Sequence, residues 1–290
     1  MALFRAVSDL AGALAATSRG LTVEACWLTA RALTYPLGFA PEQFLPADPG
    51  YRVQDLPPGR RGLLVTDLDA ARTPIVLLHG FLDNRGAFSR FRRTLRRRGF
   101  GCVHAVNYNP LLDDVRTAAA QLATQIDRIR EHTGADRVHV VGHSLGGIVA
   151  RYHVQRLGGH TAVDTVATLG SPHGGSAVAG WLPGPLGRQL RPGSELLAEL
   201  AEPATECDTR FLVVWSRLDQ VMIPRTTARL QHPDLDVEEL ELRDVGHATL
   251  PLDGRVAHWV SARLARSGPR GASRAPTSPA TLRGGSASAS

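Results

Sequence analysis

The chain has 290 residues, 43% hydrophobic and 21% charged, so it is long enough to bury a core without disulfide bonds or metal ions. Its formal net charge is +6, and all 33 of its Lys and Arg residues are arginine, with a cluster in residues 90–98 and further arginines in the C-terminal tail. A solvated helix face explains the first cluster better than a nucleic-acid partner does, so we expect no nucleic acid.

Residues 1–60 form an N-terminal extension. Residues 1–45 are rich in Ala and Leu and helical in pattern, but charged residues interrupt every apolar run. No run reaches the ~20 residues of a membrane span, and no clean cleavage site marks a signal peptide. We expect a helix pair packed on the next domain, with an amphipathic membrane-surface anchor as the alternative. Pro- and Gly-rich residues 46–60 indicate a linker. Because neither a membrane span nor a signal peptide is evident, we favour a cytoplasmic or membrane-associated location.

From residue 61 onward, apolar runs alternate with helical patterns. The expected strands lie at 61–67, 75–78, 102–106, 138–141, 163–169, 211–215 and 237–242. The expected helices lie at 86–98, 113–131, 145–157, 224–230 and 250–265. This alternation predicts an α/β catalytic domain over 61–265, with a mostly parallel sheet covered by helices on both faces. Residues 266–290 lack apolar periodicity and are expected to be a disordered tail.

Residues 171–206 interrupt the alternation with many glycines and prolines. The segment is too long for an ordinary connection, which indicates a functional role. It also carries apolar side chains, among them Trp181, Leu182 and Leu186. We predict a mobile lid over the active site, with these side chains lining an acyl pocket. The alternative is a rigid loop whose leucines complete the core.

The stretch 138–150 reads as a strand, a tight turn and the start of a helix, and the turn carries Gly-x-Ser-x-Gly at 142–146. The pattern suits a strand-to-helix elbow, where a strained backbone exposes the hydroxyl of Ser144. The helix N-terminus adds its positive dipole end near the serine. Ser144 is therefore the candidate nucleophile, with an ordinary βα turn as the alternative.

A serine hydroxyl needs a neighbouring base that is itself oriented by a carboxylate. Asp219 and His247 follow expected strands, as Ser144 does, so all three should meet at the carboxyl edge of the sheet. We predict Asp219 as the acid and His247 as the base, in the chain order serine, acid, histidine. The other carboxylates and histidines considered for these roles are Asp208, Asp244, His143, His173 and His258.

The negative charge that develops during acyl transfer needs fixed hydrogen-bond donors. The N–H group of Leu145, directly after the nucleophile, is one candidate donor. The loop His79-Gly80-Phe81 follows the apolar run 75–78, and the Phe81 N–H is the second candidate. His79 should tie this loop down and border the substrate pocket.

These motifs, with Gly-Ser-Pro-His-Gly-Gly at 170–175, resemble the α/β-hydrolase superfamily over about residues 62–265, and within it bacterial triacylglycerol lipases and related esterases. The resemblance implies hydrolysis of acyl esters or lipids through an acyl-serine intermediate, and a lid that follows the 170–175 motif. Some of these lipases hold a calcium ion, but its carboxylate ligands cannot be mapped onto this chain. Since Cys26, Cys102 and Cys207 also lack the spacing of a metal site, we predict no metal and no cofactor.

Two other functions stay open on the same residues. An acyl-enzyme can be resolved by an acceptor alcohol instead of water, which would make the protein an acyltransferase. A non-catalytic protein of this fold could instead bind lipid or a partner.

Overall fold

The computed structural model describes residues 72–81, 83–108, 114–182, 184–266 and 280–281. The expected N-terminal helices, the linker and the expected strand at 61–67 lie outside the described residues. So does the expected disordered tail, apart from Arg266 and residues 280–281, and residues 280–281 pair with the sheet as a two-residue strand.

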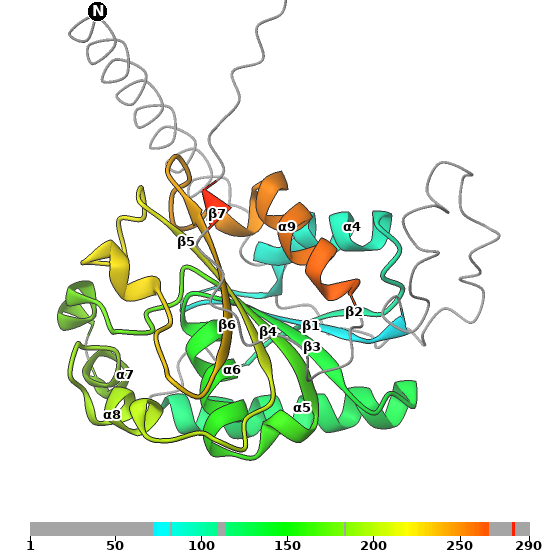
Figure 1. Ribbon diagram of the computed structural model, residues 1–290, viewed down its shortest axis with the longest axis horizontal. Coiled ribbons are helices and arrows are strands. Elements are labelled where there is room, and N and C mark those ends of the chain that lie inside the picture. Colours follow the sequence, from blue (N-terminus) through cyan, green and yellow to red (C-terminus); the bar gives the residue numbers. More distant parts are fainter. Residues whose placement is uncertain (1–71, 82, 109–113, 183, 267–279, 282–290) are drawn as a thin grey trace, which may run out of the picture.

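The centre of the molecule is a parallel sheet in the order β2-β1-β3-β4-β5-β6-β7 (Figure 1). Every pair of neighbouring strands is parallel. The strands are β1 (Ile75–Leu78), β2 (Val103–Val106), β3 (Val138–His143), β4 (Val163–Leu169), β5 (Arg210–Ser216), β6 (Asp236–Leu242) and β7 (Ala280–Thr281). Each of β1 to β6 lies within a few residues of an expected strand, which confirms the predicted parallel α/β architecture.

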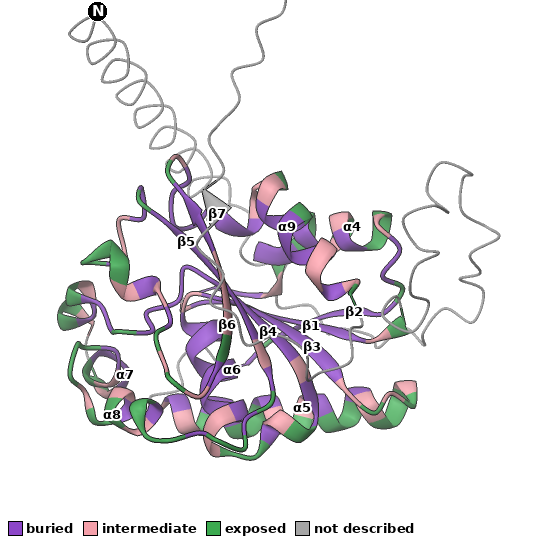
Figure 2. Cartoon of the chain, viewed as in Figure 1, coloured by how far each residue is buried: buried purple, intermediate pink, exposed green. Residues whose placement is uncertain are grey.

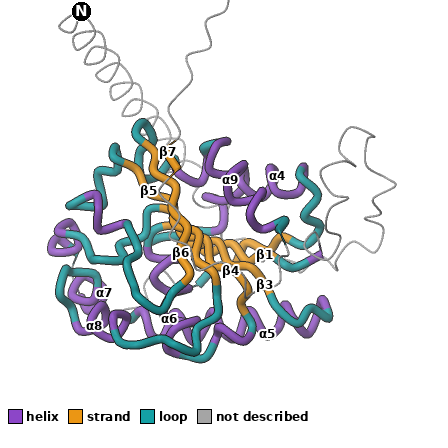
Figure 3. The backbone as a smooth tube through the Cα atoms, viewed as in Figure 1, coloured by secondary structure: helices purple, strands orange, loops and turns teal. Residues whose placement is uncertain are grey.

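Helices cover both faces of this sheet, as Figure 3 shows. On one face lie α5 (Val115–Thr133) and α6 (Leu145–Arg156), and on the other lie α4 (Ser89–Arg97) and α9 (Gly254–Leu264). Single-turn 3-10 helices occur at η3 (Arg85–Phe88), η4 (Gly159–Thr161), η6 (Arg225–Ala228) and η7 (Leu250–Leu252). None of the helices within the described residues is long and apolar enough to cross a membrane.

Successive side chains of a strand enter two separate cores because they point to opposite faces of the sheet. In β1, Val76 and Leu78 belong to the core beneath α5 and α6, whereas Ile75 and Leu77 belong to the core beneath α4 and α9. All four are at most 1% exposed. Burial on both faces explains why β1, β3, β4 and β5 consist mostly of apolar residues, and Figure 2 shows the buried sheet between half-exposed helices.

The arginine cluster of residues 90–98 lies mainly on the outer side of α4. Arg90, Arg93 and Arg97 are exposed, while Phe91 and Leu95 of the same helix are fully buried. The helix is therefore amphipathic, and its arginines form the solvated face that the sequence indicated.

The chain between β4 and β5 forms η5 (Ala177–Trp181), α7 (Gly184–Gln189) and α8 (Glu195–Ala201). Four of its leucines are at most 5% exposed and belong to the core beneath α5 and α6: Leu186, Leu190, Leu196 and Leu200. The inner part of this insertion thus completes the core, as the rigid-loop alternative expected. Leu182 is half-buried, and Trp181 is 90% exposed. Movement of this outer part stays a prediction.

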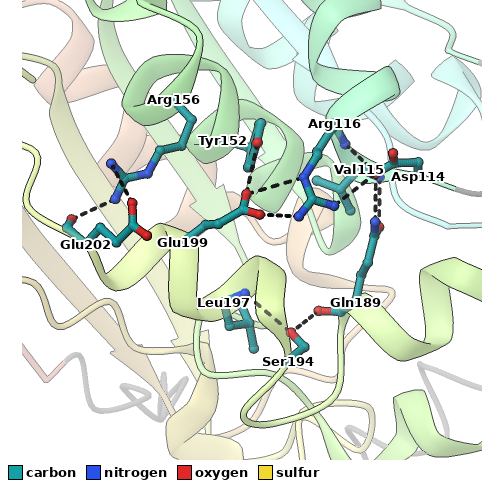
Figure 4. A network of polar contacts seen from close by, with 10 residues as sticks. All are labelled: Asp114, Val115, Arg116, Tyr152, Arg156, Gln189, Ser194, Leu197, Glu199 and Glu202. Carbon is teal, nitrogen blue, oxygen red and sulfur yellow. Dashed lines mark hydrogen bonds and ion pairs between the residues drawn. The ribbon is translucent and has the colours of Figure 1, made fainter.

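Polar contacts also fasten the insertion to the domain (Figure 4). Glu199 of α8 accepts hydrogen bonds from the guanidinium of Arg116 on α5 and from Tyr152 Oη on α6, the latter over 3.0 Å. Gln189, at the end of α7, donates to Asp114 Oδ1 over 2.7 Å and accepts from the Val115 N–H over 2.9 Å. The ends of α7 and α8 are therefore held on α5 and α6.

Candidate active site

Ser144 lies between β3 and α6 with φ of 53° and ψ of −121°. Among the described residues it alone has a positive φ without being glycine. Such a conformation costs about 1–3 kcal/mol and persists only where the surroundings enforce it. Here the Ser144 N–H is fixed on the Leu169 carbonyl at 2.9 Å, and Ser144 is half-buried while its neighbours on both sides are buried.

The flanking glycines are required by close backbone contacts. A Cβ on Gly142 would lie 2.5 Å from the Gly147 nitrogen, and one on Gly146 would overlap the Leu78 carbonyl oxygen of β1. Strand, turn and helix can therefore approach this closely only without side chains at these positions. The Gly-x-Ser-x-Gly spacing is the local cause of the elbow.

Asp219 and His247 meet directly, although 28 residues separate them in the sequence. His247 Nδ1 lies 2.8 Å from Asp219 Oδ2, and the N–H of the ring donates to the carboxylate. Asp219 Oδ1 accepts the backbone N–H groups of Val221 and Met222, both at 2.9 Å. Asp219 is fully buried and His247 is 8% exposed. The carboxylate is thus held from two sides, and the ring is oriented with Nε2 away from it.

The end of β4 joins this pair to the elbow. Leu169 accepts the Ser144 N–H, and the next residue, Gly170, has φ of 58°. A Cβ on Gly170 would lie 3.1 Å from Asp219 Oδ2 and 3.2 Å from His247 Nδ1. The elbow therefore contacts Leu169, and the Asp219–His247 pair lies against Gly170, the next residue. All of them lie at the carboxyl edge of the sheet, where ligands of parallel sheets bind.

The alternative carboxylates lie in other contacts. Asp208 forms an ion pair with Arg137 at 2.9 Å, and Asp244 forms one with Arg255 at 2.8 Å. Neither makes the contact with His247 that Asp219 makes.

Two other candidate histidines, His173 and His258, make contacts of their own elsewhere. Burial, and then the charge of Arg151, hold the pKa of His173 well below its ordinary value, so this ring is neutral. Its Nε2 bonds Thr168 Oγ1 over 3.0 Å. His258 contacts Arg98 on the face of the sheet that carries α4 and α9.

The loop after β1 lies against Ser144. A Cβ on Gly80 would be 3.1 Å from Ser144 Cβ. Phe81 follows directly and packs in part on the core beneath α5 and α6. Leu145 is the first residue of α6, and its N–H has no acceptor within the helix. Both candidate donors are therefore on segments that border Ser144.

Tyr108 anchors this loop, a role the sequence did not reveal. Its hydroxyl donates to the His79 carbonyl over 3.0 Å, and its ring stacks on the His79 ring with centroids 4.5 Å apart. Burial raises the pKa of Tyr108 above its ordinary value, so the hydroxyl keeps its proton as a donor. His79 is 1% exposed, and its Nδ1 lies 2.9 Å from the Gly80 carbonyl oxygen. The loop-tying contact expected of His79 is present, and a place beside substrate stays a prediction.

Within the described ranges, no three His, Cys, Asp or Glu side chains are grouped so that they could hold a metal ion. Cys102 and Cys207 are buried free thiols, and burial raises the pKa of each. Both therefore stay protonated and unreactive at neutral pH. Cys26 lies outside the described residues, and the absence of a metal stays a prediction.

Part of the chain is similar in sequence to known thioesterases and lipases. The palmitoyl protein thioesterase family model matches residues 74–183. A triacylglycerol lipase of Pseudomonas fragi is 32% identical over 133 residues, which cover 41% of this chain and 43% of the lipase. The lysosomal thioesterase PPT2-B of Xenopus laevis is 25% identical over 114 residues, 38% of this chain and 39% of the thioesterase. The chain thus spans about two fifths of the length of these relatives.

Solved lipase structures share the fold over a larger part of the chain. Lipase BlEst2 of Bacillus licheniformis in its mature form superposes with a TM-score of 0.55 at 18% identity, over 68% of this chain and 93% of the lipase. Lipase B of Aspergillus fumigatus gives 0.59 at 16% identity, over 71% of this chain and 56% of the lipase. With its parallel sheet and its serine elbow, the chain has the α/β-hydrolase fold, and over part of its length it is a distant relative of triacylglycerol lipases and thioesterases.

Proposed function

We propose that the protein is a serine-dependent carboxylic ester hydrolase, a lipase or esterase that acts on acyl esters. The observation that carries this proposal is the 2.8 Å contact between Asp219 Oδ2 and His247 Nδ1, placed beside the strained elbow of Ser144. A fully buried carboxylate on one imidazole nitrogen fixes the tautomer and leaves the other nitrogen free to accept a proton.

In the proposed reaction, His247 Nε2 removes the proton of Ser144 Oγ while Oγ attacks the ester carbonyl carbon. The carbonyl oxygen becomes negative and accepts the N–H groups of Leu145 and Phe81. The intermediate collapses to an acyl-serine as His247 returns the proton to the departing alcohol. Water, activated by the same histidine, then releases the acid and restores Ser144. No metal or cofactor enters this sequence.

A thioester is the second candidate substrate, because a thioesterase family model matches residues 74–183, which include Ser144. Both substrates would form the same acyl-serine and differ only in the leaving group. Rates on matched oxygen and sulfur esters of one acyl chain separate these candidates. Product analysis with an added acceptor alcohol separates hydrolysis from acyl transfer.

The exposed apolar residues support contact with a lipid surface. Trp181 of η5 is 90% exposed, and Ile223, in the loop after Asp219, is 45% exposed. The Ala177 N–H donates to the Ile223 carbonyl over 2.9 Å, so the two segments adjoin. Three exposed arginines follow in the same segments: Arg188, Arg191 and Arg225. An exposed tryptophan followed in sequence by exposed arginines suits the boundary between lipid and water, where the indole lies among lipids and arginines pair with anionic headgroups.

Hydrolysis of p-nitrophenyl esters over a series of acyl chain lengths tests the proposal, with Ser144→Ala as the matched control. Wild type should turn over at least part of the series, and Ser144→Ala should be slower by several orders of magnitude. Equal rates for the two proteins would contradict the proposal and favour a non-catalytic protein of this fold that binds lipid or a partner.

A further inference from the structure

The catalytic acid is held by a turn that depends on a residue from the insertion. Asp219 Oδ1 accepts the N–H groups of Val221 and Met222, so the direction of the carboxylate follows the backbone of these two residues. A shift of this turn would move Asp219 Oδ2 relative to His247 Nδ1. Whatever fixes the turn therefore also fixes the pair.

Ser176 bonds this turn on both sides of Met222. Its hydroxyl donates to the Val221 carbonyl over 2.5 Å and accepts the Ile223 N–H at 3.3 Å. The next residue, Ala177, donates its N–H to the Ile223 carbonyl over 2.9 Å. Ser176 lies 45 and 47 residues from its two partners and is 3% exposed. These three bonds are the direct tie between the insertion and the acid turn.

We propose that Ser176 is a positioning residue for Asp219, so that the insertion keeps the catalytic acid aligned with His247. The expected effect on rate rests on the proposed function. The expected alignment of Asp219 with His247 does not depend on it. Ser176 also caps η5, because its Oγ accepts the Val178 N–H at 3.2 Å. A plain capping role would lower stability and leave the acid unmoved, so the experiment must separate the two roles.

Ser194 is a matched control within the same insertion. It caps α8, with its Oγ accepting the Leu197 N–H at 3.3 Å and donating to the Gln189 carbonyl over 2.5 Å. It has no bond to the acid turn among its contacts. Ser176→Ala and Ser194→Ala each delete one hydroxyl that both caps a short helix and donates to a backbone carbonyl. A difference between them in catalysis therefore reports the contact with the acid turn.

The first measurement is kcat and KM on a soluble short-chain ester for wild type, Ser176→Ala and Ser194→Ala. Ser176→Ala should lower kcat about 10- to 100-fold with KM little changed, since small misplacements of catalytic groups cost rate on this scale. Ser194→Ala should stay within about two-fold of wild type, because its bonds do not reach the site. Equal rate losses in the two variants would overturn the proposal.

The second measurement is the low-field proton NMR resonance of the hydrogen bond between His247 Nδ1 and Asp219, which does not require turnover. Asp219→Asn identifies the resonance in wild type by its loss. Ser176→Ala should shift or broaden this signal, and Ser194→Ala should leave it in place. An unchanged signal in Ser176→Ala would overturn the proposal even in an active enzyme. A changed signal in a protein without esterase activity would support the alignment and refute the proposed function alone.

Discussion

His143 Nε2 lies 3.0 Å from the backbone carbonyl oxygen of His247, and their ring centroids are 4.9 Å apart. A carbonyl oxygen can only accept, so Nε2 of His143 carries the hydrogen and donates it. His143, the residue before Ser144, therefore holds the backbone of His247 in place. The sequence offered His143 only as another candidate base, and nothing in it indicated this contact across 104 residues.

Replacing His143 should disturb catalysis more than folding. His143→Phe keeps a ring in the buried site but removes the donor to His247, so we expect kcat to fall about 10-fold or more on a soluble ester. His143→Gln keeps an N–H donor and should retain more activity. Circular dichroism should show both variants folded. Identical rates for His143→Phe and wild type would show that this bond does not position the base.

Removing the carboxylate tests the assignment of the acid. Asp219→Asn keeps the size of the side chain but fails to fix the tautomer of His247, and kcat should drop by about 10⁴ as in related triads. Asp244→Asn breaks only the ion pair with Arg255 and should leave kcat within a few-fold of wild type. The reverse order of these two effects would make Asp244 the acid.

The Tyr108 hydroxyl offers a test of the loop that carries Phe81. Tyr108→Phe deletes the 3.0 Å bond to the His79 carbonyl and should lower the free energy of unfolding by about 1 kcal/mol. Because the loop borders Ser144, kcat should fall as well. Tyr152→Phe deletes a bond of the same length to Glu199 of α8, whose other side-chain partner is Arg116 on α5, and should lower stability alone. Equal kcat values for the two variants would show that the Tyr108 contact with this loop does not affect catalysis.

Trp181 tests the predicted contact with lipid. Trp181→Ser removes the most exposed large apolar side chain of the described residues. Activity on emulsified long-chain esters should fall far more than activity on soluble butyrate esters, because only the emulsion presents an apolar surface to this side chain. Equal losses on both substrates, or a loss of thermal stability alone, would point to a rigid insertion without a docking role.

Buried histidines should make stability depend on pH. Burial lowers the pKa of His153 to about 4 from an ordinary value of 6.5, so the unfolded chain binds more protons than the folded one between these values. The free energy of unfolding should therefore decrease as the pH falls from about 7 towards 4. His153→Leu removes one such group and should flatten this decrease in urea titrations at several pH values. An unchanged slope would show that His153 does not contribute.

Much of the fold could be predicted from the sequence because the central strands are buried on both faces and are mostly apolar in sequence. The structure of the insertion could not be predicted in this way. Its glycines and prolines argue against helices in isolation, but α7 and α8 form because Leu186, Leu190 and Leu200 pack into the core beneath α5 and α6. The free energy gained by this packing outweighs the low helix propensity of the segment. A single sequence does not show which residues will pack together.

The residues of the candidate site divide in the same way. Ser144, Asp219 and His247 could be predicted because each follows a strand of one sheet edge, and Gly80 brings the loop of Phe81 beside the serine. The supporting contacts of Tyr108 and Ser176 could not, since each joins residues distant in the chain through one hydroxyl. Such contacts leave no periodic or spacing signal in a single sequence.

The most direct test of the central claim is covalent labelling with a fluorophosphonate, read by mass spectrometry of the digested protein. The account predicts one adduct, on the peptide that contains Ser144, absent in Ser144→Ala and formed much more slowly in His247→Ala. Unlabelled wild type, or an adduct on a different residue, would contradict the assignment of Ser144 as an activated nucleophile.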